Sequence, residues 1–293
     1  MRAPLLIAIF SAATFASGVH GTRDSLLVST AWLADHLHDS NLVLLCVCES
    51  KDYAEHIPGA IHLDYASIQT APGPGKLTLE LPPASELADT FSRLGVGNGS
   101  RIVLYFTDDK WASRTTRTFL SLDSIGLGAN TSLLDGGFAA WKNAGRPATA
   151  ETPTVARAQL IAHPQTDVIA DLDYVRANLH HPGVDIIDAR NPEYDTGAST
   201  SAGKRAGHIP GAANVTFSTL LDSRGKFKSA EVLASMFRDA GVKEGDRVVS
   251  YCHIGQQATV VYFVARYLGY DARLYDGSWE EWSAHSDLPA EIK

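Results

Sequence analysis

The chain contains two copies of one sequence pattern, and this duplication constrains its fold more than any other feature. Three blocks recur in the same order: YAEHIPGAIHLDYASI at 53–68 matches RAGHIPGAANVTFSTL at 205–220, LGVGNGSRIVLYF at 94–106 matches AGVKEGDRVVSYC at 240–252, and LLDGGFAAWKNAGRPA at 133–148 matches LYDGSWEEWSAHSDLPA at 274–290. A repeat of this length indicates a duplicated domain rather than a solenoid unit. The total of 293 residues is also typical of two domains.

The segment between the two copies has the composition of an exposed linker. Residues 146–164 are rich in Pro, Ala and Thr, which favours an irregular connection that faces solvent. We therefore expect an N-terminal domain at 24–145 and a C-terminal domain at 165–288.

Within each copy, short β-branched runs alternate with helical patterns. In the second copy the periodicity predicts helices at 172–179, 230–241 and 256–269 and strands at 184–189, 246–252 and 272–277. Gly241 and Gly269 close two of these helices and are natural helix ends. The alternation predicts an α/β fold with two tandem domains, each a short parallel sheet flanked by helices. Ligands of such sheets bind beyond the carboxyl ends of the strands.

The first 21 residues have the pattern of a cleaved signal peptide. Arg2 supplies a positive start, residues 5–15 form an apolar run, and small residues follow at 16–21. The apolar run is too short to cross a bilayer comfortably, and no other run reaches that length. We expect a periplasmic or secreted protein that has no membrane attachment once residues 1–21 are removed. A buried first helix is the alternative.

Composition limits the classes of partner. With 45% hydrophobic and 20% charged residues the chain is globular and can bury sizeable cores. Its formal charge is −8 and it has no Lys/Arg tract, so a general nucleic-acid surface is not expected. The eleven histidines show no spacing that compels a metal site.

The chain has three cysteines: Cys46, Cys48 and Cys252. An odd count argues against a disulfide framework and leaves at least one free thiol. Cys46 and Cys48 lie two apart in a predicted strand, on one face. Neighbours at that spacing rarely have good disulfide geometry, so we expect both to be small buried hydrophobic residues without a redox role.

Cys252 ends a predicted strand, and a helix begins a few residues later. Gly255 lets the backbone of the intervening turn curl and approach a ligand closely. The peptide N–H groups of such a turn, with those of the helix start, form an anion cradle. A cradle of this kind stabilises a thiolate, the nucleophilic form of cysteine. A catalytic thiol is favoured over a core cysteine, although a Cys-x-x-Gly turn alone is a weak signal.

In its wider context the chain resembles the rhodanese sulfurtransferase family, in its tandem two-domain form, over nearly the whole length after the predicted signal peptide. The matching pieces are DARNPEY at 188–194, GHIPGA at 207–212, YCHIGQQA at 251–258 and DGSWEEW at 276–282. The resemblance implies one active site, in the C-terminal domain facing the interdomain cleft, with Cys252 as nucleophile. Phe106 stands opposite Cys252 in the N-terminal copy, which keeps the fold but not the nucleophile.

The resemblance implies a double displacement in which Cys252 takes the outer sulfur of thiosulfate and releases sulfite. The resulting persulfide is stabilised by the loop until cyanide or a thiol accepts the sulfur. The expected substrate-binding loop residues are His253, Ile254, Gly255, Gln256 and Gln257. No metal or organic cofactor is needed, the partners are a small-molecule sulfur donor and acceptor, and we expect a monomer.

The residues of the loop after Cys252 also bear on the identity of the sulfur donor. Thiosulfate-specific members resemble CRKG at this loop, and mercaptopyruvate-specific members resemble CGSG, whose serine is assigned to a proton relay. His253 and Ile254 match neither, and Ile254 removes the relay serine. His253 can add positive charge only as the pH falls toward an ordinary histidine pKa of about 6.5. Lys204 and Arg205 are the best candidates for binding the donor anion, with solvated surface charge as the alternative.

Several motif residues are expected to be structural: Arg190 in an ion pair or cap, His56 and His208 in turns, Trp279 and Trp282 in the core, and Glu280 and Glu281 on different helix faces. Three other classes compete with a sulfurtransferase. A Cys-x5-Arg phosphatase needs an arginine where this chain has Ala258. The second is a non-catalytic binding module on the same scaffold, against which the retained Cys252 argues. The third, a periplasmic sulfur carrier or thiol-redox protein, differs from the enzyme in whether free sulfite accumulates during turnover.

Overall fold

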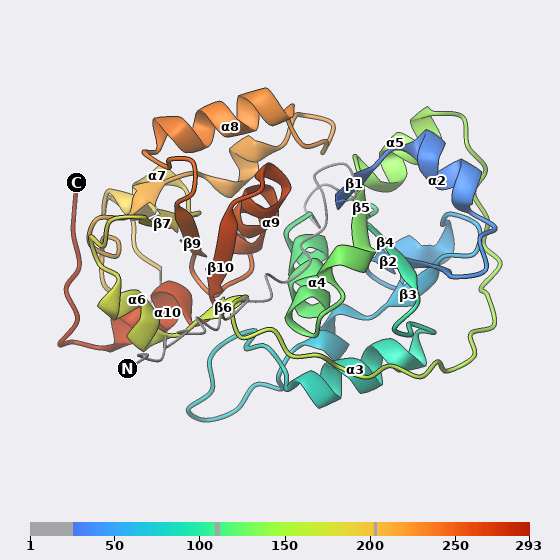
Figure 1. Ribbon diagram of the computed structural model, residues 1–293, viewed down its shortest axis with the longest axis horizontal. Helices are drawn as coiled ribbons and strands as arrows, with labels where there is room; N and C mark the ends of the chain where they lie inside the picture. Colours follow the sequence, from blue (N-terminus) through green and yellow to red (C-terminus); the bar gives the residue numbers. More distant parts are fainter. Residues whose placement is uncertain (1–25, 109–111, 202–203) are drawn as a thin grey trace, which may run out of the picture.

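The computed structural model describes residues 26–108, 112–201 and 204–293, so the predicted signal peptide at 1–21 lies outside the described residues. Two α/β domains lie side by side along the long axis of the molecule (Figure 1). Each domain is built on a five-stranded parallel sheet, which confirms the predicted fold class.

The N-terminal sheet has the strand order β1-β5-β4-β2-β3. The elements of this domain are β1 (Leu27–Val28), α2 (Thr30–His36), β2 (Leu42–Val47), η1 (Asp52–Ala54), β3 (Ile61–Leu63), η2 (Tyr65–Ile68), α3 (Ala84–Arg93), β4 (Arg101–Tyr105), α4 (Ala112–Ser124), η4 (Gly128–Asn130), β5 (Thr131–Leu134) and α5 (Gly137–Asn143), where η marks a 3-10 helix.

The C-terminal sheet repeats this topology as β6-β10-β9-β7-β8. Its domain consists of β6 (Ile169–Ala170), α6 (Leu172–Ala177), β7 (Val184–Asp188), α7 (Pro192–Asp195), β8 (Ala213–Asn214), η5 (Phe217–Leu220), α8 (Ala230–Asp239), β9 (Arg247–Tyr251), α9 (Ala258–Leu268), β10 (Asp271–Tyr275) and α10 (Ser278–Ala284). The helices and strands predicted in the second copy are all present.

Local signals explain where several helices begin and end. Ser229 caps α8 by accepting a hydrogen bond from the N–H of Val232 (3.4 Å), and Asp171 caps α6 in the same way at Tyr174 (2.8 Å). Gly269 ends α9 in the left-handed conformation, at φ 90°, which glycine adopts without steric cost.

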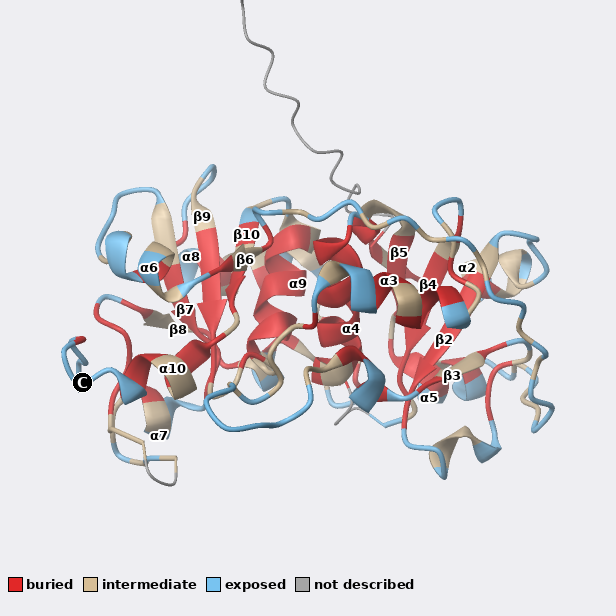
Figure 2. Ribbon diagram, turned by 90° about the horizontal axis from the view of Figure 1, so that it is seen from below, coloured by how far each residue is buried: buried red, intermediate tan, exposed pale blue. Residues whose placement is uncertain are grey.

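The domains meet through α4 and α9, which are buried along almost their whole length at the centre of the molecule (Figure 2). The rings of Phe119 and Phe263 contact edge to face across this interface, with centroids 5.0 Å apart. One continuous hydrophobic cluster includes buried residues of both helices, so the domain interface is itself a core.

Equivalent positions of the two copies touch one another at this interface. Thr116 contacts Thr259 (2.7 Å) and Ser113 contacts Gln256 (3.2 Å), and both pairs are 143 residues apart in the sequence. Arg266 pairs with Asp123 at the same spacing, 3.0 Å away. Contacts between equivalent residues arise only near a two-fold axis, so α4 and α9 pack about a local pseudo-two-fold.

The predicted linker, residues 146–164, runs in extended form over the N-terminal domain. It is held by backbone hydrogen bonds, from Ala158 to the carbonyl of Ser92 (3.0 Å) and from His163 to that of Ile125 (2.9 Å). These bonds tie the linker to one domain along much of its length.

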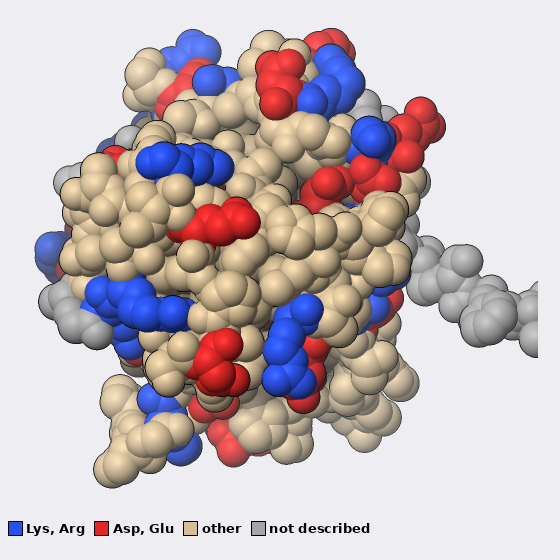
Figure 3. Space-filling view, turned by 90° about the vertical axis from the view of Figure 1, so that its left-hand side faces the viewer, with Lys and Arg blue, Asp and Glu red and all other residues tan. Residues whose placement is uncertain are grey.

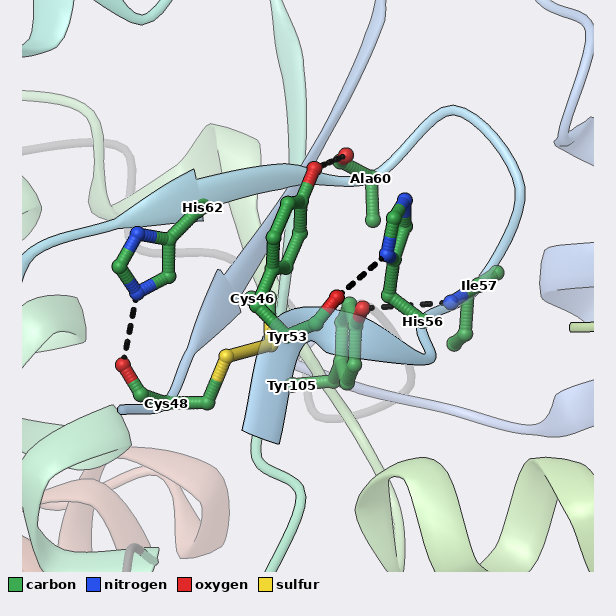
Figure 4. Close-up of a disulfide and its surroundings, with 8 residues drawn as sticks. All are labelled: Cys46, Cys48, Tyr53, His56, Ile57, Ala60, His62 and Tyr105. Carbon is green, nitrogen blue, oxygen red and sulfur yellow. Dashed lines mark hydrogen bonds between the residues drawn. A yellow bond between two sulfur atoms is a disulfide. The ribbon is translucent and has the colours of Figure 1, made fainter. Parts of the chain in front are cut away.

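Cys46 and Cys48 correct one expectation, because the structure joins them in a disulfide (Figure 4). Both are buried as predicted. Cys46 lies in β2, but the strand ends at Val47 and Cys48 belongs to the following turn. The departure from the strand brings the two Cα atoms to 5.6 Å, within the range that a disulfide spans. Cys252 is the free thiol that the odd count predicts.

The surface carries charges of both signs. Figure 3 shows Lys and Arg side chains interspersed with Asp and Glu over the face of the C-terminal domain that lies at the left of Figure 1. Within the described residues, no helix is both long and apolar enough to cross a bilayer.

Candidate active site

Cys252 lies directly after β9, the central strand of the C-terminal sheet, and is completely buried. The chain then makes a loop of five residues, 253–257, before α9 begins at Ala258. This is the carboxyl edge of a parallel sheet, where α/β proteins place their ligands. The thiol therefore stands at the base of a strand–loop–helix turn, shielded from bulk water.

The turn after β10 fixes the backbone of Cys252. The N–H of Cys252 donates to Ser278 Oγ (3.2 Å), which donates in turn to the carbonyl of Tyr275 (2.9 Å). The carbonyl of Cys252 accepts from the N–H of Trp279 (2.9 Å). Ser278 has φ 51°, a conformation that costs a non-glycine residue free energy and that occurs preferentially at functional sites.

The peptide N–H groups of residues 253–257 are unpaired within the described part of the chain, because none of them donates a hydrogen bond there. Gly255 makes the turn possible at φ 75°, and a Cβ atom there would lie 2.7 Å from the carbonyl oxygen of Asp276. Successive unpaired N–H groups at a helix start form an anion-binding concavity. The loop thus has the geometry of the predicted cradle.

An arginine of the N-terminal domain holds this loop from the other side of the interface. Arg117, fully buried in α4, donates to the carbonyl of Gly255 (3.2 Å) and pairs with Asp276 (2.5 Å). Burial alone would lower the pKa of the guanidinium, but Asp276 reverses this effect and the pKa is raised, so Arg117 stays charged. A third bond reaches the carbonyl of Leu79 (2.6 Å).

Gln256 is held by the N-terminal domain as well. Its Oε1 accepts from the hydroxyl of Tyr65 (3.2 Å) and its Nε2 donates to Ser113 Oγ (3.2 Å). Burial raises the pKa of Tyr65 to about 12, so its hydroxyl remains a donor at neutral pH. The Tyr65 ring lies within electrostatic reach of Cys252.

Two cavities between the domains adjoin this loop, and Gln256 forms part of the wall of both. One, of about 430 Å³, also includes Ser113, Phe217 and Gln257. The other, of about 390 Å³, also includes Tyr65. Small molecules therefore have room to approach the loop from either side of Gln256.

His253 is half-buried, and its surroundings decide how readily its imidazole can become positively charged as the pH falls. Its Nδ1 lies 2.7 Å from Ser201 Oγ, and its ring packs edge-on against Tyr194 with centroids 4.5 Å apart. Burial lowers the pKa of His253, and Arg190 lowers it further. The imidazole is therefore neutral at neutral pH and stays neutral further into the acid range than an ordinary histidine.

Lys204 and Arg205, the residues predicted to bind the donor anion, have protein partners in the structure. The Arg205 guanidinium donates to the carbonyls of Leu288 (2.9 Å), Trp282 (3.4 Å) and His285 (3.3 Å), where it holds the end of α10 and the following tail. Lys204 Nζ lies 3.8 Å from a carboxylate oxygen of Glu280. The geometry supports structural roles for both and does not support anion binding by Arg205.

The residues predicted to be structural are confirmed as such. Arg190 pairs with Asp188 (2.5 Å) in a fully buried ion pair, stacked over Trp279. His208 is buried, with Nδ1 2.7 Å from the carbonyl of Asp195. His56 makes the equivalent contact with Tyr53 at 2.7 Å in the first domain.

The two tryptophans and the two glutamates of the DGSWEEW motif also occupy the predicted places. Trp279 and Trp282 are in the core. Glu280 accepts a hydrogen bond from the N–H of Thr78 in the other domain (2.7 Å). Burial raises the pKa of Tyr275, and Glu281 raises it further. The two carboxylates therefore have different neighbours, as expected for adjacent residues on different faces of a helix.

Sequence reasoning did not identify four residues that support the loop: Tyr65, Ser113, Arg117 and Ser278. Three of them belong to the N-terminal domain, so a reading of the second copy alone could not place them. The repeat carried a usable signal, because Ser113 and Gln256 occupy equivalent positions and helices packed about a pseudo-two-fold bring equivalents together.

The chain matches a family model twice. The Rhodanese-like domain matches residues 29–144 and 171–285. A putative thiosulfate sulfurtransferase of Mycobacterium leprae is 31% identical, covering 92% of this chain and 99% of the relative. The sulfur carrier protein TtuD of Thermus thermophilus is 30% identical, covering 90% and 95%. A thiosulfate sulfurtransferase of Azotobacter vinelandii is 31% identical, covering 91% and 97%.

Solved structures agree with these matches. The 3-mercaptopyruvate sulfurtransferase SseA from Escherichia coli superposes with a TM-score of 0.74 and 26% identity, covering 86% of this chain and 98% of that one. YnjE superposes with a TM-score of 0.81 at 23% identity, covering 91% and 68%, a likeness of fold. With both domains matched and relatives aligned over nearly their full length, this chain belongs to the rhodanese family and consists of two tandem rhodanese-like domains.

Proposed function

We propose that this protein is a sulfurtransferase that moves a sulfane sulfur from thiosulfate to cyanide or a thiol through a persulfide on Cys252. The observation that carries the proposal is the arrangement of Cys252 under a loop whose successive N–H groups, residues 253–257, have no acceptor in the described chain. A persulfide anion supplies the negative charge that such a cradle binds.

The reaction proceeds in two displacements. The Cys252 thiolate attacks the outer sulfur of thiosulfate, the S–S bond of the donor breaks, and sulfite leaves with the bonding electron pair. The acceptor then attacks the outer sulfur of the persulfide, and Cys252 is released as a thiolate. Splitting one transfer into two steps is covalent catalysis, and it produces ping-pong kinetics.

The protein supplies position and charge to these steps. Ser278 and Trp279 hold the backbone of Cys252 on one side, and Arg117 holds Gly255 on the other. Because these bonds join rigid elements, the cradle is organised before substrate arrives, which is the condition for electrostatic stabilisation to lower a barrier. Arg117 stays charged near the loop, where its charge is paired with that of Asp276.

The names of relatives support thiosulfate as the donor, since those from Mycobacterium leprae and Azotobacter vinelandii are named as a putative thiosulfate sulfurtransferase and a thiosulfate sulfurtransferase. A second donor, 3-mercaptopyruvate, is favoured by one observation: His253 is neutral and Arg205 is engaged, so these two residues add no charge for a dianion. 3-Mercaptopyruvate carries a single carboxylate. Ile254 offers no hydroxyl for a proton relay, which weighs in favour of thiosulfate.

The biological setting follows from the first 21 residues. Their signal-peptide pattern supports an exported, periplasmic or secreted protein. We further propose that it acts as a monomer on small molecules. The relative named as a sulfur carrier makes a carrier role the alternative to turnover, in which Cys252 would hold sulfur for a partner protein.

Mass spectrometry of the reduced chain tests the proposal. Incubation with thiosulfate is expected to add one sulfur atom to the Cys252 peptide, and cyanide is expected to remove it and yield thiocyanate. A parallel sample with 3-mercaptopyruvate identifies the donor that loads faster. Sulfite release at each turnover distinguishes an enzyme from a carrier that loads once.

Cys252→Ser is the matched control, since it replaces only the sulfur atom by oxygen, and circular dichroism checks that the variant is folded. No sulfur is expected on its peptide with either donor. If the unmodified chain is folded and neither donor loads Cys252, the sulfurtransferase proposal fails.

A further inference from the structure

The disulfide of the N-terminal domain adjoins a cavity that it shares with the candidate catalytic loop. Cys48 forms part of the wall of the cavity of about 390 Å³, and Gln256 of the loop forms another part. His62 lies against Cys48, with Nε2 2.9 Å from its carbonyl oxygen (Figure 4). The pair is thus placed at a site that small molecules can enter.

A purely structural role explains this crosslink poorly. A disulfide stabilises a fold chiefly by restricting the unfolded chain, and the effect is smallest for the shortest loops. Cys46 and Cys48 enclose a single residue. The C-terminal domain ties the equivalent turn with the Asp188–Arg190 ion pair, so the fold does not require a covalent bond there.

The two cysteines differ in their place relative to the cavity. Both belong to one buried apolar cluster, but only Cys48, which is 2% exposed, is part of the described cavity wall. In thiol–disulfide exchange the attacking thiolate reaches the accessible sulfur and the other sulfur leaves. The geometry therefore selects Cys48 as the atom attacked and Cys46 as the leaving group.

We propose that Cys46–Cys48 is a thiol–disulfide exchange site, separate from Cys252, whose substrate is a small thiol or dithiol that enters this cavity. A thiolate of the substrate attacks Cys48 Sγ, the Cys46–Cys48 bond breaks, and Cys46 leaves as a thiolate that takes a proton from water. A second thiol, from the same dithiol, displaces Cys48. The substrate is oxidised to a disulfide and the cysteine pair is reduced to two thiols.

The cavity walls indicate the charge of the preferred substrate. Glu49 and Asp64 are two carboxylates among the described lining residues, and Arg114 is a cation that lies over the Tyr65 ring, 5.4 Å from its centroid. The described walls are therefore not positive overall. For each reagent, the rate of disulfide reduction in the folded chain is divided by the rate in the urea-unfolded chain, which removes the difference in intrinsic reactivity. This ratio is expected to be higher for an uncharged dithiol than for an anionic thiol such as glutathione.

The test uses the full-length Cys252→Ser chain, in which the only thiols formed are those of the pair. The folded protein is incubated with dithiothreitol, quenched with N-ethylmaleimide, and the peptide containing both cysteines is weighed. Two alkyl groups are expected, at a rate proportional to dithiothreitol, while circular dichroism shows an intact fold. Retention of the disulfide until urea unfolds the chain would overturn the proposal.

Two substitutions test the cavity as the route. Ala66→Trp places a large ring at the cavity wall and is expected to slow the reaction several-fold, and Gln69→Trp at another part of the wall gives an independent block. Ser67→Trp is the matched control, because Ser67 is an exposed neighbour that is absent from the described wall. Equal rates in the folded blocked variants and the control would contradict entry through this cavity.

The outcome is independent of sulfur transfer. Cys252→Ser cannot form a persulfide, so reduction of the pair in this variant neither requires nor supports the function proposed for Cys252. The two proposals therefore fail separately.

Discussion

The two domains secure the same turn by different chemistry. After β2 the N-terminal domain has the Cys46–Cys48 disulfide, and after β7 the C-terminal domain has the Asp188–Arg190 ion pair at equivalent positions. The ion pair depends on its surroundings: Tyr251 donates to Asp188 (2.9 Å), and Arg190 also reaches the carbonyl of Gly207 (2.8 Å). The disulfide needs no such support. Both domains therefore link the same two positions of this turn, but one link is a disulfide and the other is an ion pair.

A second contrast separates scaffold from site. The N–H of Phe138 binds the carbonyl of Phe106 (2.8 Å) just as Trp279 binds Cys252 (2.9 Å), so the backbone is the same in both copies. Where the second copy has Ser278 at φ 51°, the first has Gly137 at φ 56°. The strained serine stands in the copy where its hydroxyl accepts a hydrogen bond from the N–H of Cys252, and the other copy has the glycine that adopts this conformation without strain.

The largest effect is expected from breaking the buried ion pair. Asp188→Ala leaves the Arg190 guanidinium buried without its partner, which is expected to lower the free energy of unfolding by about 4 kcal/mol in urea titrations. Asp173→Ala, which breaks the exposed pair with Arg176, is the control and is expected to cost less than about 1 kcal/mol. Similar losses in the two variants would contradict the importance of burial.

Removing the covalent tie is expected to cost less. Cys46→Ala combined with Cys48→Ala opens a loop of three residues, for which the chain-entropy relation gives about 1.5 kcal/mol. Urea unfolding of this variant beside Asp188→Ala compares the two ties directly. A loss for the double cysteine variant as large as that for Asp188→Ala would show that the disulfide does more than close a short loop.

Exchanging the serine and the glycine tests the division between scaffold and site. Ser278→Gly removes one hydrogen bond to Cys252 and relieves backbone strain, so stability is expected to change by less than about 1 kcal/mol. Loading of Cys252 by thiosulfate is expected to slow about fivefold, the value of one hydrogen bond. An unchanged loading rate would remove Ser278 from the site.

Gly137→Ser is the reciprocal control. A Cβ atom there would overlap the carbonyl oxygen of Phe106, so this variant is expected to lose stability without a specific effect on sulfur loading.

The smallest effect concerns pH. The pKa of His253 is lowered in the folded chain. The equivalent residue of the first copy is Thr107, which has no ionisable side chain. Below the ordinary histidine pKa of about 6.5 the unfolded chain therefore binds a proton that the folded chain accepts less readily, and stability falls as the pH drops. Above about pH 6.5 the imidazole is neutral in both the folded and the unfolded chain, so His253 no longer makes the free energy of unfolding depend on pH.

His253→Gln removes this proton linkage. Between pH 7 and pH 5 its stability is expected to fall less than that of the unmodified chain, by under about 1 kcal/mol because the ring is partly solvated. Urea titrations at each pH measure the difference. A steeper fall for His253→Gln would mean that the folded chain favours the imidazolium.

The repeat made most of the fold predictable. Hydrophobic periodicity located β7, α8, β9 and α9, because these elements bury regular faces. Cys252 could also be placed, because it ends a predicted strand of a parallel sheet and ligands bind beyond the carboxyl ends of such strands. The central position of that strand was not predicted. What sequence periodicity does not encode is contact between distant segments, and this accounts for the remaining discrepancies.

Arg117 and Arg205 illustrate that limit. Both are arginines in polar stretches of sequence, yet Arg117 is fully buried against the loop that follows Cys252, and Arg205 holds backbone carbonyls near the C-terminus. The Cys46–Cys48 disulfide was missed for a related reason. Its geometry depends on where β2 stops, and a shift of one residue at a strand end lies below the resolution of sequence patterns.

The pseudo-two-fold packing of α4 on α9 has an evolutionary consequence. In a symmetric dimer, residues near the axis contact their own copies in the partner subunit. Thr116 with Thr259 and Asp123 with Arg266 follow that pattern within a single polypeptide. The domain interface thus has the form of a homodimer interface whose two subunits were fused and then diverged. On this view one half kept the thiol, and the other became the permanent partner that shapes its pocket.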